Sequence, residues 1–395
     1  MYAKADGTNP IADQSAITTN MIDDYYRDQV INHAGLNIVF PKENIPELIP
    51  TFSAVGQNGF SKTYDIIGPE QENTYGYVEN TEYPSYLKCC HTTSFKGFLN
   101  SLGENDYIRF GINRNSTTGK VVDITATHVK IRRYDANSGY MTNVEFVHGL
   151  NIASFVMCEV SFSWFGGKIR LTTINGSFVQ EWQNSQYSYS GNAQVNYGRV
   201  FLEPSIALTN VKISQSSDRF MKPVWVIGDS YTSMAAARWT YQLINNFGID
   251  GFLLDGYAGA PSGNMVPELK RLLMYGTPKY LFWCLGMNDG PVIWKYCSTE
   301  VEMMCRERGI TLVYQTIPRP SSDQGEGIGK KGIINNYIKE SGCRYVDVYD
   351  AVTENRETGA WYSGMLDDGT HPTVLGAKVI AGQVLVDFPE IANYK

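Results

Sequence analysis

The stretch that decides the fold is PVWVIGDSYTSM, residues 223–234. Four apolar residues at 224–227 run directly into Gly228, Asp229 and Ser230. A short unbroken apolar run is typical of a parallel strand that is covered on both faces. Ser230 is therefore either a turn residue that caps the next helix or a nucleophile held at the end of a strand.

The same alternation of strand-like and helix-like segments continues from residue 222 onward. Five apolar runs are predicted as strands, at residues 224–227, 251–254, 280–285, 310–316 and 345–348. Amphipathic segments are predicted as helices, at residues 234–247, 264–275, 292–308, 329–340 and 374–388. This alternation indicates a doubly wound α/β fold with a parallel sheet, in which ligands bind at the carboxyl ends of the strands.

The residues before this region show a two-residue period instead. Strands are predicted at 119–135, 154–164 and 199–214, and residues 168–182 contain the hairpin signal Asn175-Gly176. Many short strands with glycine- and asparagine-rich turns favour an all-β sandwich of the jelly-roll kind. We expect three parts: a segment at 1–35 that is helical near 12–33, the β-sandwich at 36–220, and the α/β domain at 221–395.

Charge and hydropathy exclude several kinds of partner. The 395-residue chain carries a formal net charge of −7, which argues against binding nucleic acid or an anionic membrane surface. No apolar stretch approaches the roughly 20 residues of a membrane span. The first residues contain no apolar segment typical of a signal peptide. We expect an extracellular protein if a signal peptide has been removed, and a cytoplasmic one otherwise.

The seven cysteines indicate neither a disulfide framework nor a metal site. Their number is odd, their spacing is irregular, and Cys284 lies in an apolar run typical of a reduced core residue. Cys89, Cys90 and His91 are metal-binding residue types, but no second ligand pair follows them at zinc spacing. We therefore expect no metal and no cofactor.

Four polar, glycine-bearing loops follow the predicted strands of the α/β region. They contain Gly228-Asp229-Ser230, residues 255–259 (DGYAG), residues 286–289 (GMND) and residues 367–372 (DDGTHP). Because the carboxyl ends of parallel strands meet at one edge of the sheet, these loops are expected to converge. Together they offer the groups that acyl transfer requires.

A base for Ser230 can be chosen by elimination. Four of the five histidines precede residue 150, so His371 is the one imidazole in the α/β region. Asp368, three residues earlier, can reach the imidazole around a tight turn and fix its tautomer. Asp367 is the alternative, although its side chain leaves the chain in another direction.

Three groups are candidate donors to an oxyanion. The backbone N–H of Ser230 lies at the predicted strand-to-helix turn, and Gly259 offers an N–H without a side chain in the way. Asn288 can donate through its carboxamide.

These loops, in this order, resemble those of the SGNH (GDSL-type) hydrolases over about residues 223–390. The resemblance implies a three-layer α/β/α sandwich with a five-stranded parallel sheet, and an esterase, lipase or carbohydrate deacetylase that needs no metal. It implies Ser230 as nucleophile, Asp368 and His371 as its partners, and Ser230, Gly259 and Asn288 as the oxyanion hole. The region before residue 220 is not part of the resemblance.

The substrate is expected to be an acetylated carbohydrate or another small ester. A β-sandwich beside such a domain resembles polysaccharide deacetylases, and the polar loop at residues 319–331 suits a polar substrate. Several aromatic residues are candidates for a sugar-stacking platform, although each is individually expected in a core or turn: Tyr75, Tyr77, Tyr83, Tyr86, Trp164 and Trp182. The alternatives are a lipase or other ester hydrolase, an acyltransferase, and a non-enzymatic glycan-binding surface protein. The oligomeric state is not predicted.

Overall fold

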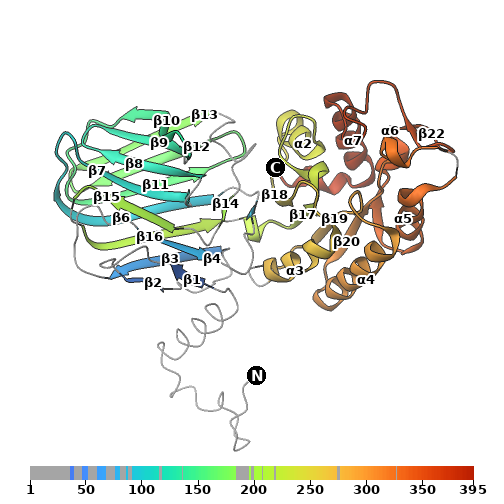
Figure 1. Cartoon of the computed structure of the whole chain (residues 1–395), viewed down its shortest axis with the longest axis horizontal. Helices are drawn as coiled ribbons and strands as arrows, with labels where there is room; N and C mark the ends of the chain where they lie inside the picture. Colours follow the sequence, from blue (N-terminus) through green and yellow to red (C-terminus); the bar gives the residue numbers. More distant parts are fainter. Residues whose placement is uncertain are drawn as a thin grey trace, which may run out of the picture.

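The computed structural model describes residues 36–39, 47–51, 60–67, 76–80, 86–87, 91–114, 118–135, 137–183, 195–196, 200–206, 208–217, 219–273, 276–325 and 327–395. Antiparallel sheets come first in the chain, and a five-stranded parallel sheet with helices follows (Figure 1). This mixed architecture is the one expected from the sequence. The helix predicted at 12–33 lies outside the described residues, as do Cys89 and Cys90. Among the residues described, no helix combines the length and apolar character needed to cross a membrane.

Two seven-stranded antiparallel sheets form the first region. The strands of one sheet, in spatial order, are β1 (Leu36–Val39), β4 (Gly76–Asn80), β15 (Val200–Pro204), β7 (Tyr107–Arg114), β8 (Thr118–Thr125), β9 (His128–Asp135) and β10 (Gly139–Val147). Those of the other are β13 (Gly176–Gln183), β12 (Gly166–Thr173), β11 (Ala153–Phe162), β6 (His91–Ser101), β16 (Thr209–Ser217), β3 (Phe60–Ile67) and β2 (Glu47–Thr51). Strands β5 (Tyr86–Leu87) and β14 (Val195–Asn196) pair separately.

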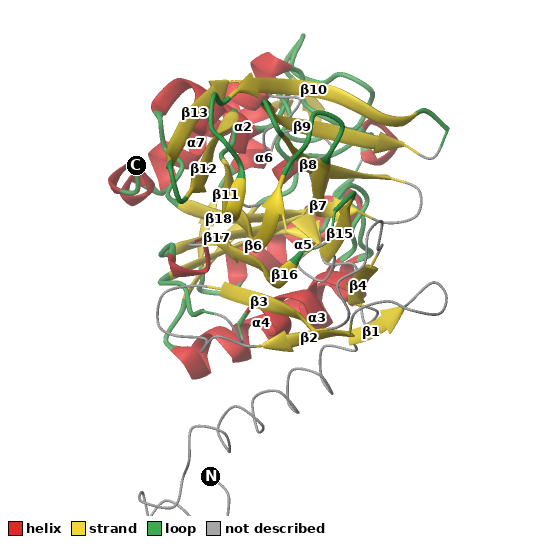
Figure 2. Ribbon diagram, turned by 90° about the vertical axis from the view of Figure 1, so that its left-hand side faces the viewer, coloured by secondary structure: helices red, strands yellow, loops and turns green. Residues whose placement is uncertain are grey.

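An apolar cluster of described residues contains side chains from both antiparallel sheets. It includes Phe95 of β6 and Phe110 of β7, whose rings stack with centroids 5.5 Å apart. From Val156 to the end of β11 every second side chain is buried, as the two-residue period predicts. The sheets therefore enclose a core of their own, and Figure 2 views the molecule from their side. The jelly-roll designation stays a prediction.

Trp164 departs from the sequence prediction. The strand predicted to end there ends at Phe162, and Trp164 packs instead with the core of the following region, its ring 5.7 Å from that of Phe252. Trp164 is 2% exposed and Trp182 8% exposed, so neither offers an open ring face to a sugar. The side chains of Tyr75, Tyr77, Tyr83 and Tyr86 lie outside the described residues.

The parallel sheet confirms the predicted α/β core. Its strands, in spatial order, are β18 (Phe252–Gly256), β17 (Val224–Gly228), β19 (Tyr280–Cys284), β20 (Thr311–Gln315) and β21 (Arg344–Val346). The first three are buried at every residue, because helices cover both faces. The chain passes from β17 to β18 on one side and then returns to β19 on the other side of β17. The carboxyl ends of β17 and β19 are therefore the topological switch point, where such sheets bind ligands.

Helices flank the parallel sheet on both sides (Figure 1). On one side α2 (Trp239–Phe247) packs on α7 (Val374–Asp387), which also contacts α6 (Val348–Val352). On the other side α4 (Pro291–Arg308) packs between α3 (Ser262–Leu272) and α5 (Gly329–Glu340). Short elements complete the region: η1 (Arg219–Met221), η2 (Ser230–Thr232), η3 (Ser321–Asp323), β22 (Thr353–Asn355), β23 (Ala360–Trp361) and η4 (Pro389–Asn393).

Several predicted element boundaries in this region were wrong, among them the end of the helix predicted at 264–275, which ends at Leu272. Helix α2 begins at Trp239 and not at residue 234, although it ends as predicted, with Gly248 in the left-handed region at φ 64°. The strand predicted at 345–348 ends at Val346, and the short helix α6 begins at Val348.

Candidate active site

Ser230 stands at the carboxyl end of β17, which pairs with β18 on one side and β19 on the other. Asp229 precedes it, and the Asp229 side chain accepts a hydrogen bond from the Tyr231 N–H at 3.0 Å. The residue that caps η2 is therefore Asp229, which leaves the Ser230 hydroxyl for another partner. Ser230 is 9% exposed, so its hydroxyl lies in a largely enclosed position at the edge of the sheet.

The turn after β17 is tight because Thr232 packs closely against two glycines, Gly228 and Gly256. A Cβ on Gly228 would lie 2.6 Å from Thr232 Oγ1, and one on Gly256 would lie 2.3 Å from the same atom. Thr232 Oγ1 donates to the Asp229 carbonyl at 2.8 Å. The space left by these glycines lets the chain fold back directly after Asp229 and places Ser230 at the rim.

His371 reaches Ser230 from the loop before α7. Ser230 Oγ and His371 Nε2 are 2.8 Å apart. The other ring nitrogen, Nδ1, lies 2.7 Å from Asp368 Oδ2. An ionised carboxylate only accepts hydrogen bonds, so Nδ1 carries the proton and Nε2 is free to accept the Ser230 proton.

Asp368 is held ionised by the chain around it. Its pKa is lowered first by the His371 side chain and then by the backbone N–H of the same residue. Its Oδ1 accepts from the N–H groups of Thr370 and His371 at 3.0 and 2.8 Å. The carboxylate at the imidazole is therefore that of Asp368, whereas Asp367 donates its backbone N–H to the His371 carbonyl.

Tyr231 contacts the loop that carries His371, a role that was not predicted from the sequence. Its hydroxyl donates to the Thr370 carbonyl, and its ring lies 5.7 Å from the imidazole of His371. The residue next to the candidate nucleophile thus supports the loop that carries the candidate base. Only its position directly after Ser230 signalled this in the sequence.

Asn288 lies in a turn after β19. The Asp289 N–H donates to the Gly286 carbonyl at 3.2 Å, which closes a four-residue turn with Asn288 at its third position. The Asn288 carboxamide Nδ2 donates to the Ala260 carbonyl at 3.1 Å and approaches Asp229 Oδ2 at 3.4 Å. The structure therefore brings Asn288 beside the residue that precedes Ser230.

Gly259 lies in the loop between β18 and α3. It has φ 74°, and a Cβ there would meet nothing within 4 Å. The loop is tied to β17 through the Tyr257 N–H, which donates to the Gly228 carbonyl at 3.0 Å. The residue after Gly259 is Ala260, which accepts from Asn288, so all three candidate donor segments meet at this edge.

Two buried carboxyls lie beneath the candidate site. Burial raises the pKa of Asp229 to about 7, helped by the neighbouring charge of Asp289. Asp289 accepts from the Ser262 N–H at 2.9 Å and from its hydroxyl, also at 2.9 Å, and so joins the loops after β18 and β19. Neither was singled out from the sequence, where both read as turn residues.

No group of three or more histidine, cysteine or acidic residues among the described residues could hold a metal ion. Cys284 is a free, buried thiol, as expected. The cluster of Cys89, Cys90 and His91 lies outside the described side chains.

No protein-family model and no curated protein sequence matches the chain. Among solved structures, a putative acylhydrolase from Bacteroides fragilis is 16% identical with a TM-score of 0.36, over 44% of this chain and 88% of that one. A GDSL-like lipase from Bacteroides thetaiotaomicron is 16% identical with a TM-score of 0.35, over 43% and 88%. An acetylxylan esterase from Geobacillus stearothermophilus is 14% identical with a TM-score of 0.34, over 42% and 92%. The similar structures thus include the GDSL-type enzymes that the sequence motifs resemble.

Proposed function

We propose that this chain is a serine ester hydrolase that forms an acyl-enzyme on Ser230. One observation carries the proposal: His371 Nε2 lies 2.8 Å from Ser230 Oγ while His371 Nδ1 lies 2.7 Å from Asp368. A serine hydroxyl is a weak nucleophile at neutral pH and becomes useful when an oriented base takes its proton. The two distances lie in the range that this proton transfer requires.

The proposed reaction has two halves. Ser230 attacks the ester carbonyl as its proton passes to His371, and the imidazolium that forms is stabilised by Asp368. His371 then gives the proton to the departing alcohol. In the second half His371 takes a proton from water, the resulting hydroxide attacks the acyl-enzyme, and the carboxylic acid leaves as Ser230 recovers its proton.

The tetrahedral intermediates carry an oxyanion that needs donors. The candidates are the Ser230 N–H, the Gly259 N–H and the Asn288 carboxamide, on the three loops that meet at this edge of the sheet. Donors fixed before the reaction stabilise the developing charge without reorganisation.

For the substrate, we propose an O-acetylated carbohydrate. The loop at residues 319–331 is polar and rich in glycine, and the Ser321 N–H donates to the Gly369 carbonyl at 2.7 Å. That contact places the loop beside the turn that holds Asp368 and His371. A polar border favours a hydrated alcohol such as a sugar over a lipid.

Esters with a longer apolar acyl chain are a second candidate. The first turns of α4, which begins three residues after Asn288, expose Val292 at 79%, Ile293 at 56% and Tyr296 at 74%. Exposed apolar side chains beside a site can contact an acyl chain.

Labelling with a fluorophosphonate tests the enzyme proposal directly. Wild-type protein should be modified on Ser230, as located by peptide mass spectrometry, and Ser230→Ala should lose both the label and the hydrolysis of p-nitrophenyl acetate. Ser363→Ala is the matched control, because Ser363 is an exposed serine outside the set of Ser230, Asp368 and His371. A glycan-binding protein without an activated serine would show no label, and that result would reject the proposal.

The substrate is tested by acetate release from acetylated xylan, pectin, mannan and sialic acid. Release from one of these acetylated carbohydrates, with weak activity on p-nitrophenyl octanoate, would support the carbohydrate ester. Preference for the octanoate would support the second candidate. Acetyl transfer to an added sugar acceptor, seen by mass spectrometry, would make the enzyme an acyltransferase.

A further inference from the structure

Lys331 is a buried lysine that contacts the turn carrying Asn288. It belongs to the first turn of α5 and is 6% exposed. Its Nζ donates to the Gly286 carbonyl at 2.8 Å and to the Asp289 carbonyl at 3.0 Å. These are the first and last residues of the turn in which Asn288 holds the third position. One ammonium group therefore binds both ends of that turn.

The burial of this ammonium needs compensation. Desolvation lowers the pKa of Lys331, and the carboxylates of Asp323, Asp289 and Asp229 act in the opposite direction. A buried cation is stable where hydrogen bonds and opposite charges replace its hydration. An apolar side chain would fill the same space without that cost, so stability alone does not explain a lysine here.

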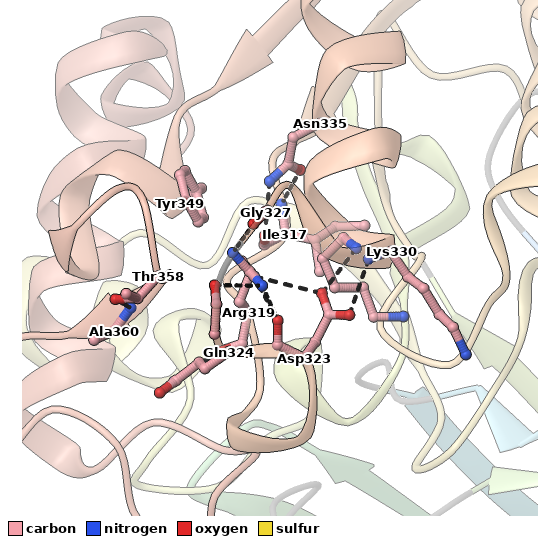
Figure 3. Close-up of polar contacts among 12 residues, drawn as sticks. Ile317, Arg319, Asp323, Gln324, Gly327, Lys330, Asn335, Tyr349, Thr358 and Ala360 are labelled. Carbon is pink, nitrogen blue, oxygen red and sulfur yellow. Dashed lines mark hydrogen bonds and ion pairs between the residues drawn. The ribbon is translucent and has the colours of Figure 1, made fainter.

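The loop before α5 fixes where that helix begins, and so fixes the position of Lys331. The Asp323 carboxylate accepts from the Lys330 N–H at 2.9 Å and from the Lys331 N–H at 3.0 Å, and so caps the helix. Arg319, which is 3% exposed, binds the Asp323 carbonyl through its guanidinium and donates to the Gly327 carbonyl at 2.9 Å. Figure 3 shows Asp323 between Arg319 and the start of the helix.

The next turn of α5 fixes its rotation. Asn335, four residues after Lys331 and on the same face of the helix, accepts from the Ile317 N–H at 2.7 Å and donates to the Ile317 carbonyl at 2.9 Å (Figure 3). Ile317 also packs against Gly286, where a Cβ would lie 2.1 Å from its side chain. The helix that presents Lys331 is thus tied to the end of β20, next to the turn that Lys331 binds.

We propose that Lys331 is a positioning residue, which holds the turn at residues 286–289 so that the Asn288 carboxamide points at the reacting carbonyl oxygen. This inference rests on the proposed function, since it assigns Lys331 a role in the same ester hydrolysis. Donors in an oxyanion hole act only when they are fixed in the geometry of the transition state. A turn freed at both ends leaves Asn288 attached but imprecisely aimed.

The test compares four variants on p-nitrophenyl acetate: Lys331→Met, Lys331→Gln, Lys330→Met and Asn288→Ala. Lys331→Met keeps an unbranched stem of four atoms and removes the ammonium donors, and it should lower kcat about tenfold or more with KM within about twofold. Lys331→Gln keeps one neutral donor and should lie between Lys331→Met and wild type. Lys330 is exposed on the same turn, so Lys330→Met should match wild type.

A double-mutant cycle shows whether Lys331 acts through Asn288. Asn288→Ala should cost about 10²–10³ in kcat, and the variant that combines it with Lys331→Met should lie within about twofold of Asn288→Ala alone. A residue that merely stabilises the fold would lower the melting temperature and add its own loss to that of Asn288→Ala. Additive losses would therefore overturn the inference.

The outcomes separate this inference from the proposed function. If wild type is labelled and active, and the kcat of Lys331→Met equals that of wild type, the role of Lys331 is overturned and the esterase proposal stands. Wild type without label or activity overturns both. If Lys331→Met fails to fold, as judged by circular dichroism, the same cycle with Lys331→Gln decides the question by the same criterion.

Discussion

Asp368 binds His371 twice, through the imidazole Nδ1 at 2.7 Å and through the backbone N–H of the same residue at 2.8 Å. The two contacts use different carboxylate oxygens. The backbone contact fixes the carboxylate on the turn, and the ring contact then fixes the imidazole on the carboxylate. The orientation of the base toward Ser230 is therefore set within four consecutive residues of the chain.

Asp368→Asn should lower kcat by about 10²–10⁴, because a neutral amide stabilises neither the required tautomer nor the imidazolium. KM should change little, since Asp368 lies behind the imidazole and away from Ser230. Steady-state kinetics on p-nitrophenyl acetate measure both. Asp367→Asn is the matched control and should keep activity, because its carboxylate does not bind the ring. Equal losses in the two variants would contradict the assignment.

Tyr231→Phe should lower kcat about tenfold, because it removes the hydroxyl that binds the Thr370 carbonyl and loosens the turn that orients His371. Loss of one hydrogen bond should also cost about 0.5–1.5 kcal/mol of stability. Urea unfolding and kinetics on the same preparation measure the two effects. Full activity with reduced stability would limit Tyr231 to a structural role.

Gly359→Ala should destabilise the protein more than Gly364→Ala. Both glycines have positive φ, 74° and 78°, so each alanine costs about 1–2 kcal/mol of backbone strain. At Gly359 the added Cβ would also lie 2.3 Å from Arg319 Cδ, whereas at Gly364 it would meet nothing within 4 Å. Displacing Arg319 adds about 1–3 kcal/mol. Chemical denaturation measures the free energy of unfolding of both variants. Equal losses of stability would show that the Arg319 side chain moves aside without cost.

The parallel sheet and its loops could be predicted because their signals are local. The strands β17 and β19 are apolar runs, and the four candidate loops at 228–230, 255–259, 286–289 and 367–372 each begin with glycine or an acidic residue. The proximity of Ser230, Asp368 and His371 then follows from the rule that such loops converge. The sequence left open whether Ser230 was a cap, and the structure assigns that role to Asp229.

The errors in element boundaries come from side chains that compete with the backbone. Residues 234–238 continue the helical pattern of α2, but Thr240 donates to the Ser233 carbonyl and Gln242 to the Ala236 carbonyl. These bonds hold the segment in turns and delay the helix. Helix α6 was missed because its signal is a single cap, in which Asp347 accepts from the Asp350 N–H.

The burial of Lys331 could have been predicted from the helical period of α5. It shares a buried helix face with Ile334 and Ile338, and a lysine on such a face predicts a buried partner. The identity of that partner could not be predicted, because Gly286 and Asp289 lie more than 40 residues earlier. Contacts between distant loops depend on the packing of α5 on the sheet, which no local pattern encodes.

Asp229→Asn should change how stability depends on pH. The pKa of Asp229 is raised to about 7 in the folded protein, chiefly by burial, against about 4 in an unfolded chain. Below pH 4 Asp229 is protonated in both the folded and the unfolded state, so its ionisation does not lower the free energy of unfolding. As the pH rises from 4 to 7 the unfolded state loses the proton first, so wild-type stability falls by an amount on the order of a few kcal/mol.

The comparison with Asp229→Asn isolates this effect, because the other titrating groups are shared. The neighbouring charges of Asp289, Lys331 and Arg238 face Asp229 in wild type and remain in the variant. The difference in unfolding free energy between the two proteins should therefore move in favour of the variant between pH 4.5 and 7.5, as measured by urea unfolding at several pH values. A difference that is constant over this range would mean that Asp229 is already ionised at pH 4.5 and that its burial is compensated by its hydrogen bonds.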